Sequence, residues 1–365
     1  MESLVTANVR QRPVRALVSA AGVALGVCLV MLFTGLARGM SNDLQRRSSN
    51  ISAEIIFTRA GGTELMSTTM NLPMQYVDEL ARVEGVEQAV ASGRYVSQGG
   101  RGFGFEQIEG VDWEAYARMN GMRLVEGAAP AGVDEVVVDE TKARNNSLSV
   151  GSTVSLFGNQ PYKVTGVYTP ESGPRVKMSL AAMQDALEAP DKATWIYVKV
   201  RAGADPVEVA RRIDEALPGN KIQLTRDVIT NIERSIPYLG VFLRTLVVLS
   251  AVVSGLVVML AMYTTITERT REIGILKALG APRRFIVGEI VKEALLISLF
   301  GVVAGFAISL VAGYLIHRAY GLFFEYSWAW ALTAAAIGLL GGALGALYPA
   351  VRAAKLDPVS ALAYD

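Results

Sequence analysis

The sequence predicts an α-helical membrane protein with four transmembrane helices and an extracytoplasmic α/β domain of about two lobes. Hydrophobic residues make up 51% of the 365 residues. They are concentrated in four long segments that contain no ionisable residue. Between the first and second of these segments the composition changes to that of a soluble α/β domain, with more acidic than basic residues. These two observations set the fold class.

Each of the four apolar segments is long enough to cross a bilayer. The segments are Ala16–Ala37, Thr245–Thr267, Ala294–Ile316 and Tyr326–Val351. As a helix, each would be roughly 33 Å long or longer, against a hydrocarbon core of about 30 Å. We therefore predict four membrane spans.

The first segment has a second interpretation, because Arg10, Arg12 and Arg15 precede it as they would in a cleaved signal peptide. Its apolar run is longer than the roughly 7–15 residues of a signal-peptide core, and no clean cleavage site follows. We expect the segment to be retained as a membrane anchor.

Basic residues set the expected orientation, because short cytoplasmic loops are enriched in lysine and arginine. One basic group precedes the first span, a second lies between the second and third spans, and a third follows the fourth. The second group consists of Arg269, Arg271, Lys277, Arg283 and Arg284. The third consists of Arg352 and Lys355. Both termini are therefore expected in the cytoplasm, and residues 41–235 outside it.

Residues 41–235 alternate or cluster β-branched and aromatic residues as strands do. We predict strands at 53–59, 86–99, 134–139, 152–158, 162–169 and 195–201, and helices at 74–85 and 205–219. The strands between 134 and 169 would form one compact lobe, and the remaining chain a second. The predicted domains are thus 1–40 with the first span, 41–235 outside, and 236–365 with the other three spans.

Several function classes are disfavoured. The net charge of +1 gives no basic excess for nucleic acid. The glycine-rich segment 99–105 lacks the Lys-Ser/Thr of a phosphate-binding loop, so we expect a hairpin tip there and no bound cofactor. His317 is the only histidine and follows the third span, which excludes histidine-dependent catalysis and histidine metal sites in the external domain. With Tyr320, Glu325 and Tyr326 it is expected to form an interfacial belt. No catalytic or metal site is predicted.

Small residues recur along the third and fourth spans, where they allow helix backbones to approach closely. They are predicted to pack against other helices of the same chain or against a second copy. The positions are Gly301, Gly305, Ser309 and Gly313, and Gly338, Gly342 and Gly345. Few polar residues line the spans, which disfavours a conventional channel or ion-coupled transporter.

The segment between the second and third spans is charged yet regular. The seven ionisable residues between positions 268 and 284 would cost well over about 15 kcal/mol at the bilayer centre, so the segment lies in water. Ile273, Leu276 and Gly280 share one stripe of a short helix, and Glu272 can meet Arg269 at i,i+3 spacing. From the pattern alone, this helix could lie on the membrane surface or insert into a groove of a cytoplasmic partner.

The stretch "TERTREIGILKALGA" closely resembles the cytoplasmic helix of the MacB, FtsX and LolC/LolE family, the membrane subunits of type VII, or mechanotransmission, ABC transporters. "NVRQRPVRALVSAAGVALGVCLV" is similar to the start of the family's first span. "LVEGAAPAGVDEVVVDETKARNNSLSVGSTVSLFGNQPYKVTGVY" resembles its periplasmic core domain, and "YPAVRAAKLDPVSALAY" resembles its C-terminal signature. The resemblance covers nearly the whole chain.

The resemblance implies that residues 268–280 form a helix that couples the chain to a separate ATPase subunit, which binds ATP and Mg²⁺. It favours the partner groove over the membrane surface. The coupling residues it implies are Glu268, Arg269, Arg271 and Glu272 at the charged end, Ile273, Ile275, Leu276 and Leu279 as an apolar ridge, and Gly280 at the end of the helix.

The resemblance also implies a multi-pass protein of the bacterial inner membrane, usually with a second permease copy in a homodimer or heterodimer. A membrane-fusion adaptor and membrane lipids are further expected partners. The implied function is non-catalytic, with ATP hydrolysis in the partner driving export or extraction of a lipid, lipoprotein, peptide or other amphiphile. The alternative is a transmembrane regulator that activates an extracytoplasmic hydrolase, as FtsX-like members do.

Overall fold

The computed structural model describes residues 13–60, 69–98, 105–227 and 237–355. Its contacts divide the chain into two compact units. The helical unit comprises Met1–Met40 and Pro237–Asp365, and the α/β unit comprises Ser41–Ile236.

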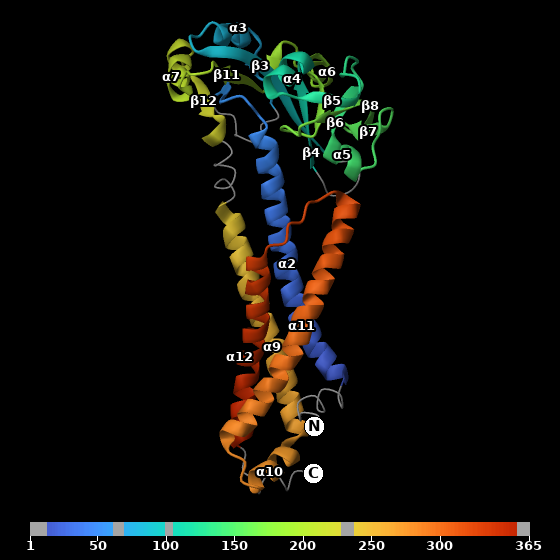
Figure 1. Cartoon of the computed structure of the whole chain (residues 1–365), viewed down its shortest axis with the longest axis vertical. Helices are drawn as coiled ribbons and strands as arrows, with labels where there is room; N and C mark the ends of the chain where they lie inside the picture. Colours follow the sequence, from blue (N-terminus) through green and yellow to red (C-terminus); the bar gives the residue numbers. More distant parts are fainter. Residues whose placement is uncertain (1–12, 61–68, 99–104, 228–236, 356–365) are drawn as a thin grey trace. The chain divides into compact units, whose positions relative to one another are not determined.

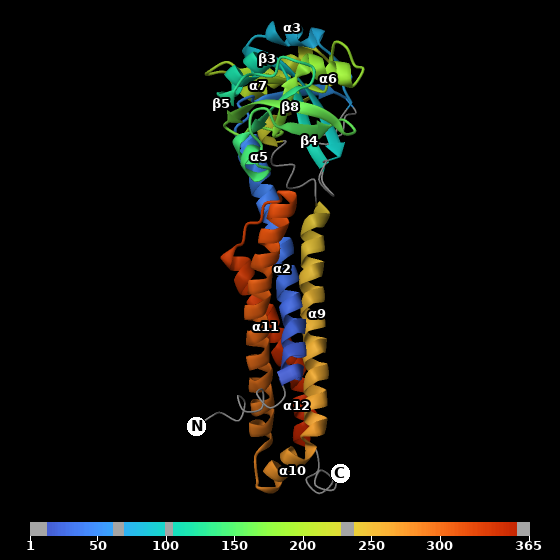
Figure 2. The same cartoon turned by 90° about the vertical axis from the view of Figure 1, so that its right-hand side faces the viewer.

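The helical unit is built from four long helices that run alongside one another (Figures 1 and 2). They are α2 (Pro13–Ser49), α9 (Pro237–Glu268), α11 (Arg283–Tyr320) and α12 (Trp328–Lys355). All four are long and apolar enough to cross a membrane, which confirms the four predicted spans. A short helix, α10 (Thr270–Ala278), connects α9 to α11. The last turns of α2, from Ser41 onward, belong to the α/β unit.

The α/β unit contains one large mixed sheet with short helices. Its strands are β1 (Ile55–Arg59), β3 (Val86–Gln98), β4 (Phe105–Val111), β5 (Arg123–Gly127), β6 (Glu135–Asp139), β7 (Thr153–Leu156), β8 (Gln160–Thr169), β9 (Val176–Ser179), β11 (Trp195–Val200) and β12 (Asn220–Leu224). Its helices are α3 (Gln75–Ala81), α4 (Trp113–Asn120), α5 (Glu140–Asn145), α6 (Leu180–Ala186) and α7 (Pro206–Ala216). A separate two-stranded sheet pairs β2 (Leu72–Pro73) with β10 (Lys192–Ala193).

The large sheet has the strand order β12-β1-β11-β3-β4-β9-β6-β8-β5, with β7 also paired to β8. The half that contains the predicted lobe at 134–169 meets the other half where β4 and β9 pair in parallel. Ile108–Val111 lie opposite Val176–Ser179 at this seam. The two parts predicted from the sequence therefore share one continuous sheet. The six predicted strands and two predicted helices are present, whereas β4, β5, β9 and β12 were not anticipated.

Strand alternation gives the sheet a buried surface on each face. On β11, Ile196 and Val198 lie in the larger apolar core, while Trp195 and Tyr197 lie in a second core with residues of α4 such as Tyr116. At the end of β3, Gln98 pairs with Phe105 of β4 in an antiparallel ladder. The predicted hairpin tip between them, at 99–104, lies outside the described residues.

Candidate functional site

Most of the predicted coupling segment, residues 268–280, folds as α10, between the ends of α9 and α11 in Figure 1, whereas Glu268 is the last residue of α9. Helix α10 ends at Ala278, and Gly280 follows with a φ of 89°, which glycine readily adopts. The amide of Ala281 donates to the carbonyl of Leu276 at 3.0 Å and so satisfies part of the helix end. The Gly280-Ala281-Pro282 sequence thus turns the chain into α11, which begins at Arg283.

One side of α10 is fixed to the ends of the long helices by Ile273, which is 8% exposed. Ile273 lies in an apolar cluster with residues from each of the three neighbouring helices. These are Ile266 of α9, Ile286 of α11, and Ala353 and Ala354 of α12. A displacement of α10 would therefore act on three spans at once.

Polar contacts fix the same side. The Lys277 ammonium donates to the carbonyl oxygen of Ala354 at 3.1 Å. Arg269 pairs with Glu272 at 2.8 Å, as the i,i+3 spacing predicts, and its guanidinium also lies 3.5 Å from the Glu293 carboxylate of α11. These contacts link α10 to α11 and α12 in addition to its covalent connections.

Among the residues that the structure describes, nothing covers the opposite side of α10. Ile275, Leu276 and Leu279 are 46%, 37% and 79% exposed, and Arg271 and Glu272 are also exposed, as is Glu268 at the end of α9. Of the four residues in the predicted ridge, Ile273 points toward the spans and the other three form the exposed part. We call these three residues the α10 ridge.

The predicted small-residue positions lie against other parts of the helical unit, five of them against long helices. A Cβ added to Gly301 or Gly305 would lie 2.7 Å from a backbone carbonyl of α2, at Ala20 or Ala24. Gly338 lies against Val302, Gly342 against Ser298, and Gly345 against the backbone of Gly255. Gly313 lies against Tyr326, and Ser309 is fully buried.

This packing predicts opposite effects for two glycine-to-alanine substitutions in α11. Gly305→Ala is expected to lower the unfolding free energy by about 1–3 kcal/mol, because the new methyl group meets the Ala24 carbonyl. Gly288→Ala meets nothing within 4 Å, and should raise the unfolding free energy by up to about 1 kcal/mol through helix propensity. Thermal unfolding of the full chain in detergent measures both. Equal shifts for the two variants would contradict the packing.

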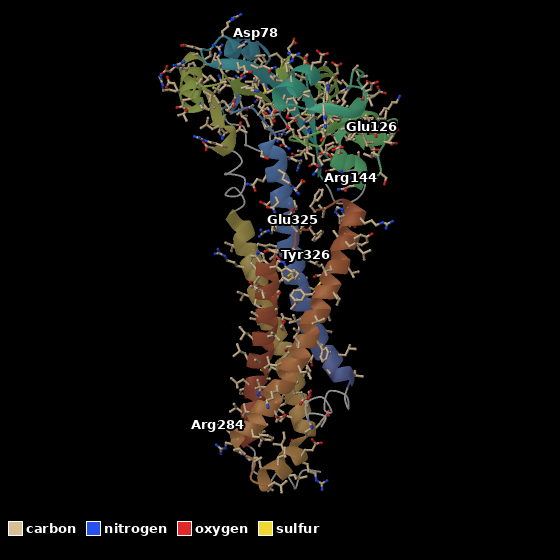
Figure 3. The ribbon with its side chains drawn as sticks, in the orientation of Figure 1. Asp78, Glu126, Arg144, Arg284, Glu325 and Tyr326 are labelled. Atoms are coloured by element: carbon tan, nitrogen blue, oxygen red, sulfur yellow. The ribbon has the colours of Figure 1, made fainter. Side chains whose placement is uncertain are left out.

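The predicted interfacial residues lie in the last turn of α11, which holds His317 and Tyr320, and in the segment that leads to α12, which holds Glu325 and Tyr326. Tyr326, labelled in Figure 3, donates to the carbonyl of Ser309 at 2.8 Å. The His317 Nδ1 atom lies 2.8 Å from the carbonyl oxygen of Leu322, and the amide of Glu325 donates to Gly35 at 3.0 Å. The belt remains a prediction, but Tyr326 and His317 have defined contacts within the helical unit.

A fully buried ion pair lies at the β4–β9 seam, where sequence reasoning anticipated no functional residue. The Lys177 ammonium lies 2.6 Å from the Glu109 carboxylate, and both side chains have no exposed surface. Three hydroxyl groups also donate to Glu109: those of Ser92 and Tyr197 at 3.0 Å, and that of Tyr116 at 3.3 Å. This set of donors satisfies the buried carboxylate.

The surroundings of the ion pair keep Glu109 ionised. Burial by itself would raise its pKa, but the charges of Lys177 and Arg94 outweigh that effect, so the pKa of Glu109 is lowered. Burial lowers the pKa of Lys177, against the opposing effect of Glu109. The stability contributed by ionised Glu109 is therefore present above the ordinary carboxylate range, and is lost as pH falls through the lowered pKa.

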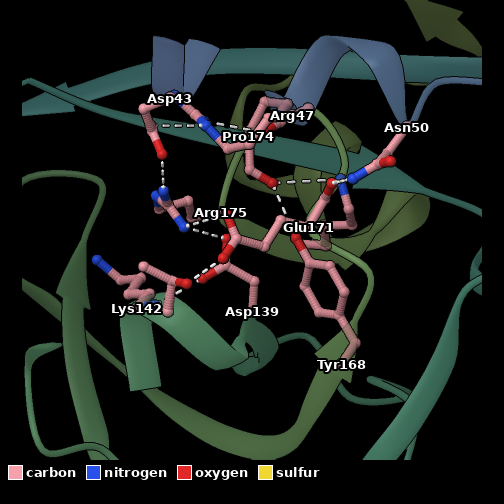
Figure 4. Close-up of polar contacts among 12 residues, drawn as sticks. Asp43, Arg47, Asn50, Asp139, Lys142, Tyr168, Glu171, Pro174 and Arg175 are labelled. Atoms are coloured by element: carbon pink, nitrogen blue, oxygen red, sulfur yellow. Dashed lines mark hydrogen bonds and ion pairs between the residues drawn. The ribbon is translucent and has the colours of Figure 1, made fainter. Parts of the chain in front are cut away.

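A second polar cluster joins the last turns of α2 to the loop between β8 and β9 (Figure 4). Arg175 is at its centre, and its guanidinium contacts the carboxylates of Asp43, Asp139 and Glu171. Asp43 also pairs with Arg47 at 3.0 Å. We call these five residues the α2 clamp. No motif in the sequence pointed to it, because its members are spread over three segments that only the fold brings together.

Neither cluster has the composition of a metal centre. Among the residues that the structure describes, no group of three or more histidine, cysteine, aspartate or glutamate side chains is arranged to hold a metal ion. In both clusters the carboxylates are neutralised by lysine or arginine.

Comparisons with known proteins identify two family regions. A family described as "MacB-like periplasmic core domain" matches residues 16–216, and one described as "FtsX-like permease C-terminal" matches residues 244–358. The first match alone covers more than half of the chain.

Individual relatives are similar over most of this chain. A macrolide export ATP-binding/permease protein MacB from Shewanella sp. (strain ANA-3) is 26% identical over 383 residues, which cover 94% of this chain and 57% of the relative. A pyoverdine export ATP-binding/permease protein PvdT from Pseudomonas putida is 26% identical over 381 residues, which cover 93% and 56%. The chain thus spans less than three fifths of the length of these relatives.

Among solved structures, the periplasmic region of MacB from Actinobacillus actinomycetemcomitans is similar to part of the chain. The TM-score is 0.39 with 14% sequence identity, and the similarity covers 52% of this chain and 98% of that one.

Proposed function

The chain belongs to the family of FtsX-like permeases with a MacB-like periplasmic core domain, and from this premise we propose that it is the membrane subunit of an ABC transporter. A partner ATPase binds ATP and Mg²⁺ and acts on the chain through α10. The chain itself is non-catalytic, and converts the ATPase cycle into movement of the α/β unit outside the bacterial cytoplasmic membrane. That movement drives export or extraction of a lipid, lipoprotein, peptide or other amphiphile.

The observation that carries the proposal is that one side of α10 is packed against the long helices while the other side is exposed. Its inner side is fixed by Ile273 to three long helices, while the α10 ridge is exposed. An exposed apolar ridge between charged residues suits a partner groove, in which a few buried anchors supply most of the binding energy. A helix fixed on one side and docked on the other can pass displacement from a partner to the spans.

The charges that surround α10 support a position in water. The first turns of α11 carry Glu289, Lys292 and Glu293 after the basic pair at its start, which includes Arg284 (Figure 3). The eleven residues from Arg283 to Glu293 correspond to about 16 Å of helix. They separate α10 from the apolar part of α11. The basic residues Arg352 and Lys355 end α12 near the same cluster. A cytoplasmic position for this end, and for both termini, follows from the positive-inside rule.

The proposal includes a second permease copy, identical or different, and allows a membrane-fusion adaptor. The small residues of α11 and α12 that were predicted for packing or dimerisation are already packed against other parts of the same helical unit. A second copy would therefore contact other faces of the helical unit.

Charge reversal at the exposed end of α10 tests the docking. In detergent, the full chain should co-purify the ATPase co-expressed from its own genome. We expect Arg271→Glu to reduce recovery of the ATPase by about tenfold, as loss of a charged contact of roughly 1.4 kcal/mol would do. Arg211→Glu, at an exposed position of α7 in the α/β unit, is the matched control and should leave recovery unchanged.

The same purification separates the proposed transporter from a hydrolase regulator. A transporter should have its ATPase rate stimulated by an amphiphile that is retained by cells lacking the chain. A regulator should instead capture an extracytoplasmic hydrolase and show no such stimulation. Undiminished ATPase recovery with Arg271→Glu, Leu276→Glu and Leu279→Glu would show that α10 is not the docking element.

A further inference from the structure

The α2 clamp closes around the point where α2 ends. Arg175 donates to Asp139 at 2.6 Å and to Glu171 at 3.1 Å through one nitrogen, and contacts Asp43 through the other. Its side chain is 14% exposed, and that of Asp139 has no exposed surface. Because the charges are largely shielded from water, these contacts are stronger than ion pairs on an open surface.

The loop before β9 also caps the helix through its backbone. The amide of Gly173 donates to the carbonyl of Arg47 at 3.2 Å, and the Arg47 guanidinium donates back to the Gly173 carbonyl at 2.9 Å. The side-chain amide of Asn50 donates to the backbone carbonyl of Glu171 at 2.6 Å. The Ser172 hydroxyl donates to the backbone carbonyl of Asn50 at 3.2 Å. The last carbonyls of a helix normally lack partners. Here the loop supplies a partner for the Arg47 carbonyl and a second one for the Asn50 carbonyl just beyond the helix, so α2 ends in defined contacts.

The clamp joins α2 to the middle of the sheet. Arg175 directly precedes β9, and Asp139 is both the last residue of β6 and the N-cap of α5, where it accepts from the Lys142 amide at 2.6 Å. Strands β6 and β9 are neighbours in the sheet. Burial raises the pKa of Asp139, and the charge of Arg175 opposes that effect.

The last nine residues of α2, Ser41 to Ser49, contain neither proline nor glycine, and α2 is helical from Pro13 onward. Sharp bends in helices usually occur at such residues, and the nearest one, Gly39, precedes Asp43 by about one turn. Displacement of this last segment would therefore be passed on to the clamp and not absorbed by bending within the segment.

We propose that Arg175 is a positioning residue for energy coupling. By holding Asp43 of α2 to Asp139 of the sheet, it makes the end of α2 a rigid part of the α/β unit, so that movement of the span is delivered to β6 and β9. This role rests on the proposed function, because it requires an ATP-driven movement of α2. It is distinct from ATPase docking, which takes place at α10.

Hydrogen exchange measured by mass spectrometry can follow this coupling without a known substrate. The full chain is reconstituted in nanodiscs with its co-purified ATPase, and exchange is compared with and without ATP. In the unmodified protein, ATP should change exchange both at α10 and at β9 and α5. In Arg175→Ala, the change at β9 and α5 should shrink by about fivefold or more, the low end of ordinary coupling between sites. The change at α10 and the ATPase rate should stay within about twofold.

Two further variants separate positioning from folding. Arg175→Lys keeps the charge but lacks the two-nitrogen fork, so it should restore part of the ATP-dependent change. Asp43→Asn keeps the side-chain shape and should behave as Arg175→Ala does. Arg211→Ala, which removes exposed ion pairs with Glu208 and Glu215 on α7, is the control and should leave every signal unchanged.

Spin labels test rigidity directly. In a Cys28→Ser background, nitroxides at Gln45 of α2 and Arg144 of α5, both exposed, should give a narrow distance distribution that broadens in Arg175→Ala. The positioning role would be overturned by either of two results. One is an unbroadened distribution; the other is a full ATP-dependent change at β9 and α5 in Arg175→Ala. If the unmodified chain did not co-purify the ATPase, that result would instead contradict the proposed function.

Discussion

Leu276→Glu is expected to weaken binding of the partner ATPase by roughly a hundredfold, which corresponds to about 2.8 kcal/mol. The side chain is 37% exposed in the free chain and lies on the α10 ridge, beside Leu279. If a partner groove covers this side chain, the new carboxylate must lose its hydrating water without gaining a hydrogen-bond partner. Such desolvation costs about one to several kcal/mol of binding free energy. Binding of the purified ATPase to the full chain in nanodiscs measures the effect.

Val150→Glu is the matched control, because Val150 is 43% exposed and lies in the α/β unit. It introduces the same charge at similar exposure, and should change the affinity by less than about twofold. An affinity within about threefold of the unmodified chain for Leu276→Glu would contradict docking at the α10 ridge.

Lys177→Met is expected to lower the unfolding free energy of the α/β unit by about 3–5 kcal/mol. The substitution leaves the Glu109 carboxylate fully buried without its ammonium partner, and breaking a buried pair in this way costs more than the pair contributes. Chemical unfolding of the full chain, followed by the fluorescence of Trp113 and Trp195 after Trp328 and Trp330 are replaced by phenylalanine, measures the change.

The double variant Glu109→Gln/Lys177→Met removes both charges but keeps an acceptor for the hydroxyls of Ser92 and Tyr197. It should recover more than half of the lost stability. Lys163→Met, an exposed lysine on β8, should change stability by less than about 0.5 kcal/mol. A loss below about 1 kcal/mol for Lys177→Met would show that the carboxylate is not left uncompensated.

Acid adds an independent check on the same pair. Because Lys177 and Arg94 lower the pKa of Glu109, the unmodified α/β unit should keep this contribution through the ordinary carboxylate range and lose it only at lower pH. In Lys177→Met the largest opposing charge is gone and burial raises the pKa of Glu109, so the ionised carboxylate becomes destabilising. The stability deficit of this variant relative to the unmodified protein should therefore shrink as pH falls and Glu109 is protonated. Unfolding curves between pH 3 and 7 would display the difference.

The spans could be predicted from the sequence because length and apolarity alone define a membrane-spanning helix. The end of α10 could also be predicted, since Gly280 followed by Pro282 is a local stop signal. The direction of Ile273 could not. It depends on the ends of α9, α11 and α12 meeting at one place, and no local pattern carries that information.

The polar clusters of the α/β unit were missed for a related reason. Glu109 and Lys177 are separated by 68 residues and meet only because β4 and β9 pair in parallel. Each charge sits inside a short strand and interrupts its apolar pattern, which hides the strand as well as the pair. Arg175 likewise gains its role from Asp43, which is 132 residues away. A charged residue flanked by buried apolar neighbours, as Lys177 is by Val176 and Met178, was the available signal.

The unbroken sheet has a consequence for the proposed export or extraction of an amphiphile. A clamshell that closes on a ligand needs two lobes joined by a pliable hinge. Here a hinge between the halves would have to separate β4 from β9 and expose the ion pair of Glu109 and Lys177. The α/β unit of one chain is therefore a single plate. Under the proposed function, any compartment that it opens and closes needs its other wall outside this unit.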